Sequence, residues 1–448
     1  MMLSSDKQKT FIQKKSILQI FIRFCYYIAC GQICKGQIGG FMSTKGEKIV
    51  VTGMGAVTPI GCGVDDYWNN LINGECGIDR IMRFDAENLA VRIAAEVKDF
   101  DINAYMPKKV IHETDAFTQY AYVAAAEALG DTLPAAADRV GIVMGTAMAG
   151  VATTAATQEE LTNAVHKNVG PRFVPRILGN IAAAQIAISY GIYGPSSTIS
   201  TACASGCDAV STAAMMLLAD EADAVLAVGS ESILCPLVIY SLANAHTLSR
   251  SNDDPLHACR PFDMSRNGFV IGEGGGALVL ETRSHAEARG AEIYAELAGW
   301  ANNNDAYHVI KPDPEGKMSA RCMRMVIDRA GMQPAEIDYI NAHGTGTKLG
   351  DRAELAAISK VFEGHRPAIS STKGATGHVM GGGGLTESIA CIQAIREGIL
   401  PPNLNLEEPE GDFDFVAGVS RKQEIKVAMT NAFGFGGQNS SLIFKKYE

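Results

Sequence analysis

Cys203 has the sequence context of a catalytic nucleophile. It follows the extended Ser/Thr-rich stretch 196–202 and precedes the Ala/Met/Leu-rich stretch 204–219, a pattern that predicts a strand-to-helix turn. At the start of a helix, unpaired backbone N–H groups favour a thiolate and can later bind an oxyanion. The residues on both sides are small and leave room for an acyl chain. The alternative is a small core residue, which is what most buried cysteines are and what we expect of Cys207.

Two histidines lie in Gly/Thr-rich loops, and each loop follows a predicted strand. His343 stands within residues 341–347 (Asn-Ala-His-Gly-Thr-Gly-Thr), and His378 ends residues 371–378 (Ser-Thr-Lys-Gly-Ala-Thr-Gly-His). A lone histidine is usually a surface or satisfied core residue, but two in equivalent loops can enter one cleft. Two imidazoles can donate hydrogen bonds to a thioester oxygen that becomes an enolate, while an ammonium such as Lys373 and a carboxylate fix their protonation.

Glycines flank the remaining candidates for the site. The run Gly381–Gly384 leads into a predicted helix that bears Glu387, for which a solvated helix residue is the alternative. Residues 431–437 (Asn-Ala-Phe-Gly-Phe-Gly-Gly) join two predicted strands. Their glycines allow a sharp turn that carries Phe433 and Phe435 as a mobile aromatic gate. The alternative is a glycine-rich hairpin with core phenylalanines.

Two other glycine patterns are not expected to bind nucleotides. Gly53-Met-Gly55 follows a predicted strand, but Thr58 occupies the third glycine position of a dinucleotide-binding fingerprint, so we expect a tight turn there. The segment Gly272–Gly276 lies between predicted strands rather than before a helix, so we do not expect it to cradle a phosphate.

The elements that position these residues follow a duplicated plan. Apolar runs of strand length alternate with Ala/Leu/Met-rich helical stretches, which predicts α/β sheets covered by helices. Residues 116–145 and 321–343 each contain a predicted helix, a turn ending in Gly, a Pro-Ala segment ending in Asp, and a strand. Two such halves stacked face to face would place the site in a cleft at their interface. We expect three parts: an N-terminal extension (1–46), a half with Cys203 (47–295) and a half with both histidine motifs (296–448).

Composition restricts partners and compartment. A formal net charge of -10 disfavours broad nucleic-acid binding, and no Lys/Arg stripe with interleaved aromatics occurs in the 448 residues. The eleven cysteines form no regular framework, which predicts free thiols in a reducing cytoplasm. Cys25, Cys30 and Cys34 lack nearby residues to complete four ligands, so we expect no metal site.

The first residues call for a separate interpretation. Residues 16–30 are largely apolar and follow several lysines, but Arg23 interrupts the run, and it is too short to span a bilayer. We expect residues 1–41 to be a dispensable extension without stable membrane insertion. Peripheral membrane contact is the alternative.

Together these motifs resemble the β-ketoacyl-acyl-carrier-protein synthase family, and most closely its elongating type II members from bacterial fatty acid synthesis. The resemblance runs in order from about residue 47 to 446 and is carried by residues 201–206, 252–255, 260–263, 268–273, 343–347, 373–378 and 433–437. It implies a thiolase-like fold, in which two duplicated α/β halves form a layered α-β-α-β-α core.

The resemblance also implies roles for the site residues. Cys203 takes an acyl group from acyl-carrier protein, and its backbone N–H forms an oxyanion hole with that of Phe433. Malonyl-carrier protein then binds and loses carbon dioxide, His343 and His378 stabilise the enolate, and the resulting carbanion attacks the Cys203 thioester. Lys373 and Glu387 match residues that support the histidines, Phe433 matches the gate, and no cofactor or metal is implied.

Several positions depart from the family pattern or define its pocket. Met148 and Leu242 fall where the family lines its acyl pocket, and Leu242 replaces a more usual aromatic. Thr345 and Thr347 are expected to line the same substrate pocket.

The expected docking surface for the acidic carrier protein also departs from the family pattern. It includes Lys108 and Lys109, beside which His112 and Glu113 weaken the basic patch. Arg172 and Arg176 are expected to add contacts.

Three functions remain open at this stage. Fatty-acid elongation leads, a ketosynthase of a specialised type II polyketide or aryl-polyene pathway is its nearest rival, and a non-catalytic partner subunit of a synthase complex is the third. Cys203 argues against the third, because the chain-length-factor type of partner lacks that thiol. The resemblance implies a homodimer, with a heterodimer as the alternative.

Overall fold

The computed structural model describes residues 46–98, 100–164 and 168–448. Residues Glu47–Glu448 form one compact unit. The expectations about residues 1–41 and about the thiols of Cys25, Cys30 and Cys34 fall outside the described residues. The expected extension 1–46 does so except for its last residue. In the part of the chain that is described, no helix combines the length and apolarity needed to cross a membrane.

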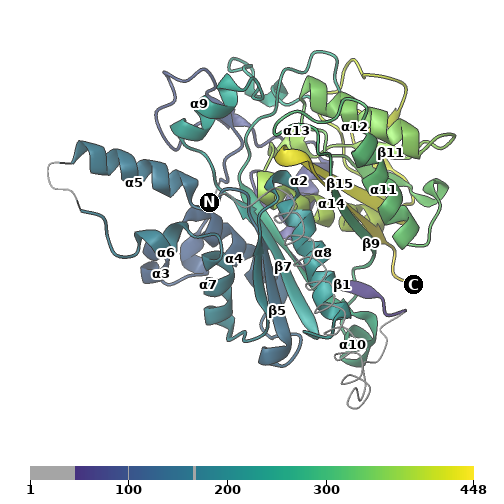
Figure 1. Ribbon diagram of the computed structural model, residues 1–448, viewed down its shortest axis with the longest axis horizontal. Helices are drawn as coiled ribbons and strands as arrows, with labels where there is room; N and C mark the ends of the chain where they lie inside the picture. Colours follow the sequence, from purple (N-terminus) through teal and green to yellow (C-terminus); the bar gives the residue numbers. More distant parts are fainter. Residues whose placement is uncertain (1–45, 99, 165–167) are drawn as a thin grey trace, which may run out of the picture. The chain divides into compact units, whose positions relative to one another are not determined.

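A mixed sheet runs through the unit and consists of two half-sheets (Figure 1). In spatial order, the first contains β6 (Ser196–Ile199), β5 (Val140–Gly145), β7 (Ala224–Glu231), β8 (Gly274–Thr282) and β1 (Ile49–Thr58), with β2 (Gly61–Cys62) paired to β1. The second contains β9 (Ala295–Asn304), β16 (Gln438–Lys445), β15 (Val427–Gly434), β10 (Tyr339–Asn341), β11 (Ala368–Ser370) and β13 (Asp414–Phe415). Antiparallel pairing of β1 with β9 joins the half-sheets.

The two half-sheets share one topology. In the first, β6, β5 and β7 run parallel to one another, β8 pairs antiparallel with β7, and β1 pairs antiparallel with β8. In the second, β11, β10 and β15 run parallel to one another, β16 pairs antiparallel with β15, and β9 pairs antiparallel with β16. The predicted repeat is confirmed, because α4 (Ala116–Leu129) leads through a 3-10 turn to β5 as α11 (Lys317–Arg329) leads through another to β10.

Five layers result from how the helices pack. Buried residues of α8 (Ser205–Leu218) and α14 (Gly383–Glu397) share an apolar cluster with strand residues of both half-sheets. The helices α4 and α7 (Ile181–Tyr190) pack on the other face of the first half-sheet. The helices α11 and α12 (Lys348–Val361) pack on the corresponding face of the second half-sheet. The predicted α-β-α-β-α core is therefore confirmed.

The remaining elements flank or connect these layers, and Figure 1 shows α5 projecting to one side. They are α2 (Val64–Ile72), β3 (Asp79–Arg80), β4 (Ile93–Ala94), η1 (Ile102–Ala104), α3 (Lys108–Glu113), η2 (Ala137–Arg139), α5 (Val151–Asn163), α6 (Phe173–Ile177), η3 (Ala202–Ala204), α9 (Pro236–Asn244), η4 (Pro255–His257), α10 (Arg283–Ala288), η5 (Pro334–Glu336), α13 (Lys373–Thr376), η6 (Met380–Gly382), β12 (Ile399–Leu400), β14 (Arg421–Lys422) and η7 (Phe435–Gly437).

The glycines at positions 53 and 55 serve packing. The prediction of a tight turn there is wrong, because both lie inside β1. A Cβ atom would lie 2.1 Å from the carbonyl oxygen of Ala128 at Gly53, and 2.0 Å from that of Ala124 at Gly55. Glycine is therefore needed for α4 to approach the strand closely.

Candidate active site

Cys203 lies in the short 3-10 turn η3 between β6 and α8, as the sequence predicted. Ala202 has a φ of 51°, an uncommon value for a residue with a side chain. The hydroxyl of Ser205 supports the turn: it accepts from the N–H of Thr201 at 2.9 Å and donates to the carbonyl of Ala202 at 2.7 Å. The turn leaves the thiol 6% exposed at the start of α8.

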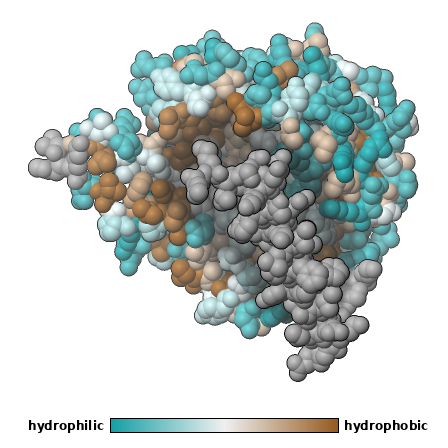
Figure 2. Space-filling view, viewed as in Figure 1, coloured by the Kyte–Doolittle hydropathy of each residue, from teal (hydrophilic) through white to brown (hydrophobic). Residues whose placement is uncertain are grey.

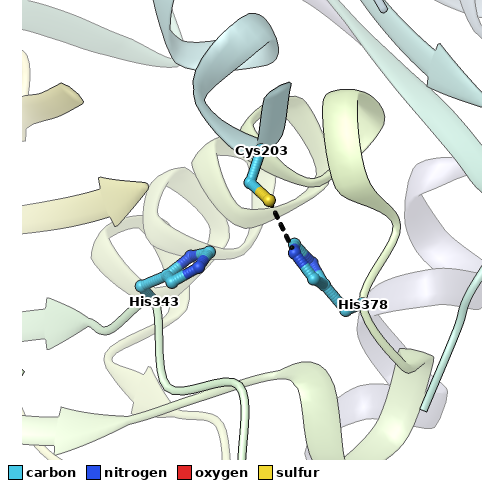
Figure 3. Close-up of side chains that lie close together, drawn as sticks. All are labelled: Cys203, His343 and His378. Atoms are coloured by element: carbon cyan, nitrogen blue, oxygen red, sulfur yellow. Dashed lines mark hydrogen bonds between the residues drawn. The ribbon is translucent and has the colours of Figure 1, made fainter. Parts of the chain in front are cut away.

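His378 faces the thiol from the other half of the chain. Its backbone N–H donates to the carbonyl of Val270 at 2.8 Å, and its carbonyl accepts from the N–H of Gly272 at 2.9 Å. These two bonds fix the loop after α13. The Nε2 atom of the imidazole lies 3.0 Å from Sγ of Cys203 (Figure 3).

His343 completes the cluster from the loop after β10. Its ring centroid lies 5.2 Å from that of His378, with the rings nearly perpendicular. Potential ligand atoms of Cys203 and the two histidines all lie within 4.8 Å of one another (Figure 3). Neither Nδ1 atom has a hydrogen-bond partner among the residues described.

The carboxylate of Glu354, a residue that the sequence interpretation missed, holds the His343 loop. It accepts hydrogen bonds from the N–H groups of His343 and Gly344, each at 2.8 Å. The sequence did carry a signal, since Asp351, Glu354 and Ile358 fall at i, i+3 and i+7 of α12 and are all buried. Two acids on the apolar face of a helix indicate that they have buried partners.

Both imidazoles are neutral at pH 7. Burial, the Lys373 ammonium and the neighbouring imidazole lower the pKa of His343 well below its usual value. Burial and Lys373 do the same to the pKa of His378. Lys373 forms a buried ion pair with Glu387, so the alternative of a solvated Glu387 is excluded.

The thiol is also neutral in the resting site. Burial raises the pKa of Cys203 to about 11, although the N–H of Phe435 and the charge of Lys373 lower it. The expectation that the start of the helix would keep the sulfur ionised is therefore wrong, because loss of hydration outweighs these donors. The proton must leave during the reaction, and the neutral Nε2 of His378 is within reach.

The backbone donor beside the sulfur differs from the expectation. The N–H of Phe435 hydrogen-bonds the Cys203 sulfur, so Phe435 rather than Phe433 supplies the backbone donor. The Phe433 ring lies 6.1 Å from that of His343. Gly434 lies between them in close contact with Cys203, since a Cβ atom there would be 3.0 Å from its backbone N.

A cavity of about 410 Å³ leads to this cluster. Among the residues that line it are Cys203, Thr345, Thr347, His343, His378, Phe433 and Phe435. The other two predicted pocket residues lie elsewhere. Leu242 packs on the apolar cluster that contains Cys203 and Met380, while the Met148 side chain is 43% exposed.

The expected docking residues lie on and beside α3. Lys108 and Lys109 are exposed at the start of this helix. At its other end, Arg172 forms an ion pair with Glu113, and Nε of Arg176 donates to the carbonyl of Thr114 at 3.1 Å. The four basic residues thus surround one short helix, and their role in docking stays a prediction.

The fold and the cluster define a class of protein. A cysteine at the start of a buried helix in one repeat, faced by two neutral imidazoles from the other repeat, is the arrangement of a thiolase-like condensing enzyme. Comparison with known proteins gives the family. Residues 46–286 match the family model "Beta-ketoacyl synthase, N-terminal domain", and residues 294–407 match "Beta-ketoacyl synthase, C-terminal domain". The chain belongs to the β-ketoacyl synthase family, whose members are acyltransferase-type condensing enzymes.

Relatives of known function cover nearly the whole chain. The chain is 41% identical over 410 residues to 3-oxoacyl-[acyl-carrier-protein] synthase 2 of Synechocystis sp., which covers 90% of this chain and 99% of that protein. The protein of the same name from Coxiella burnetii is 40% identical over 408 residues, covering 89% and 99%. The solved ishigamide ketosynthase/chain length factor is 32% identical with a TM-score of 0.83, covering 90% of this chain and 100% of that one.

Proposed function

We propose that this chain is a β-ketoacyl-acyl-carrier-protein synthase that extends an acyl chain by two carbons in fatty acid biosynthesis. It transfers the acyl group to Cys203 and condenses it with malonyl-carrier protein. The observation that carries the proposal is the 3.0 Å separation between the Cys203 sulfur and the neutral imidazole of His378, inside a cavity that His343 also lines.

Acylation begins with proton transfer from the thiol of Cys203 to Nε2 of His378. The sulfur then attacks the carbonyl carbon of the incoming thioester. The N–H groups of Cys203 and Phe435 bind the oxyanion as it forms. When the carbonyl re-forms, the carrier's thiol leaves with the proton from His378, and the acyl group remains on Cys203.

Condensation uses both imidazoles as hydrogen-bond donors. Each donates its Nε2–H to the carbonyl oxygen of the malonyl thioester, and the enolate produced by loss of carbon dioxide is stabilised there. The enolate carbon attacks the Cys203 thioester, a carbon–carbon bond forms, and the Cys203 sulfur leaves as a thiolate that is reprotonated from solvent. The unpartnered Nδ1 of His378 supports these two uses, because either tautomer can exist without breaking a bond to the protein.

The decisive experiment is intact mass spectrometry after mixing the protein with a panel of acyl-carrier proteins. We expect one acyl adduct on the wild-type chain and none on Cys203→Ala, with condensation reduced about 10³-fold or more. If the wild-type chain formed no adduct and Cys203→Ala kept full function in a complex, the non-catalytic partner would be the correct interpretation.

A ketosynthase of a specialised pathway is the second candidate. It is favoured by Leu242, which replaces a more usual aromatic beside the thiol's apolar cluster, and by relatives such as the ishigamide ketosynthase/chain length factor. Product profiles with defined acyl and malonyl carriers separate the two. Saturated elongation products support fatty-acid synthesis, whereas poly-β-keto or polyene products support the specialised pathway.

Carrier docking is proposed at the basic residues around α3. Lys108 and Lys109 are exposed, and an acidic carrier protein would meet them without displacing an ion pair recorded in the described structure. In Lys108→Ala/Lys109→Ala we expect a KM for acyl-carrier protein raised about tenfold, and a weaker dependence on salt. Turnover of a small-molecule thioester should not change. Unaltered KM and salt dependence would refute this docking site.

Homodimerisation in the cytoplasm is proposed as the working state. The outer strand β6 alternates exposed and half-buried residues, and its outer edge, which pairs with no other strand of the described residues, can pair with a second copy. A reducing compartment fits the thiols of Cys76, Cys203, Cys207, Cys235, Cys259, Cys322 and Cys391.

A further inference from the structure

The buried carboxylate of Glu231 lies beside the condensing site without a role in the chemistry above. It ends β7 and is 0% exposed. Its Oε1 accepts from the hydroxyl of Thr146 at 3.0 Å and from the N–H of Met148 at 3.1 Å. Its Oε2 accepts from the N–H of Ala147 at 2.6 Å and from that of Gly381 at 3.2 Å. Each oxygen therefore serves two donors.

These four donors come from two segments that are distant in sequence. The loop after β5 (residues 146–149) belongs to the first half, whereas Gly381 lies in η6, three residues after His378. In the same turn, Sδ of Met380 lies 3.8 Å from Sγ of Cys203. One carboxylate thus connects the loop of the first half to the turn that contacts the nucleophile.

The two segments approach more closely than side chains would permit. A Cβ atom on Gly381 would lie 2.6 Å from the backbone N of Ala147 and 2.7 Å from Oε2 of Glu231. Met380 and Ala149 both have positive φ, at 47° and 46°. Such conformations are unfavourable for residues with a side chain and persist only where the surroundings impose them. The bonds to Glu231 supply that constraint on both segments.

A buried carboxylate with a purely structural role is expected to have a cationic partner. Glu281, which is also buried and lies near the end of β8, is such a residue. Glu281 is neutralised by Arg289 and is bonded by His285 and Thr52. Glu231 forms no ion pair with any residue of the described chain, and only N–H and O–H donors meet it. Burial raises its pKa to about 7. A buried carboxylate without a cation is costly, and when it is charged it raises the pKa of the Cys203 thiol.

We propose that Glu231 is a positioning residue, whose carboxylate sets the separation between loop 146–149 and the Met380 turn and so defines the space for the acyl chain beside Cys203. The inference rests on the proposed function, because it takes an acyl thioester as the occupant. Long chains contact more of this wall than short ones, so the effect of Glu231 must grow with chain length.

The test is Glu231→Gln, which keeps the volume but replaces one oxygen by an NH₂ group facing two donors. Acylation of Cys203 is measured by mass spectrometry with a short and a long acyl-carrier protein. We expect kcat/KM to fall about tenfold for the long chain and less than about threefold for the short one, so the ratio of the two should change by more than about threefold. Glu281→Gln is the control and should leave the ratio unchanged.

Thr146→Val provides a second variant that removes only one of the four donors. It should shift the ratio in the same direction by a smaller factor, even if Glu231→Gln fails to fold. Equal losses for both chain lengths in Glu231→Gln, or a ratio unchanged in both variants, would overturn the inference. Alkylation of Cys203 by iodoacetamide reports on the site without a carrier. If the wild-type chain is alkylated but accepts no acyl group, the proposed function fails instead.

Discussion

At the scale of single residues, the site is a set of neutral groups that acquire charge only during the reaction. Burial raises the pKa of the Cys203 thiol and lowers that of both imidazoles. If the thiol and the imidazoles were charged in the resting site, their charges would be buried without a substrate to pair with, and burying such charges is costly. The neutral cluster avoids that cost, and the incoming thioester provides the oxygen on which charge develops.

The raised pKa of Cys203 predicts how its alkylation depends on pH. Because the thiolate is the nucleophile, and burial raises the pKa to about 11, the rate of iodoacetamide labelling should keep increasing above pH 9. Peptide mapping after timed labelling gives the rate at Cys203. A plateau below pH 8 would contradict the prediction.

The buried ion pair of Lys373 and Glu387 predicts a distinctive double-mutant cycle. In Lys373→Met the Glu387 carboxylate loses its partner, and we expect a loss of about 3–5 kcal/mol in the free energy of unfolding. Lys373→Met/Glu387→Gln should recover most of that loss, since no unpaired charge remains. Urea unfolding measures both. Equal losses in the single and double variants would show that the unpaired Glu387 carboxylate is not what destabilises Lys373→Met.

How much of the site could be predicted from sequence depended on the kind of contact. The cysteine and the histidines were predictable because each follows a strand in a segment of small residues. Glu231 and Glu354 act through backbone N–H groups brought to them by folding, and no local pattern gives those partners. That Phe435 rather than Phe433 places its N–H beside the Cys203 sulfur could not be predicted, because it depends on where β15 ends against Cys203.

At the scale of elements, the repeat explains why the site lies where it does. Cys203 follows β6 and Lys373 follows β11, and these are equivalent strands of the two half-sheets. The repeat was visible in the sequence because it recurs as a local order of elements. We propose that the division falls near 295/296, because one family match ends at residue 286, the other begins at residue 294, and β9, the first strand of the second half-sheet, begins at Ala295.

The close packing of α4 on β1 predicts a large effect of one methyl group. In Gly55→Ala the Cβ atom would lie 2.0 Å from the carbonyl oxygen of Ala124, so the helix must shift. We expect a loss of about 1–3 kcal/mol or more in the free energy of unfolding. Gly170→Ala is the control, because no atom of the described residues lies within 4 Å of its Cβ position. Equal stability of both variants would contradict this packing argument.

At the scale of the whole molecule, the pairing of β1 with β9 could not be predicted, since it joins strands on opposite sides of the repeat boundary. The surface could be interpreted only in part from the sequence.

Figure 2 shows apolar residues gathered on the side where α5 and α6 lie. On that half of the chain, Val174, Ile188 and Tyr193 are exposed by 57%, 76% and 79%. Large exposed apolar residues near a free strand edge indicate an interface.

This surface leads to a prediction about assembly. If two copies pair through β6 and α7, then Ile188→Lys/Tyr193→Asp places charges where apolar side chains would be buried, and the protein should elute as a monomer. Light scattering coupled to size-exclusion chromatography measures the mass directly. Val419→Lys, at a residue 75% exposed in the other half, should leave the mass of the dimer unchanged. A wild-type monomer would favour a heteromeric partner, and a dimer that survives the double substitution would place the interface elsewhere.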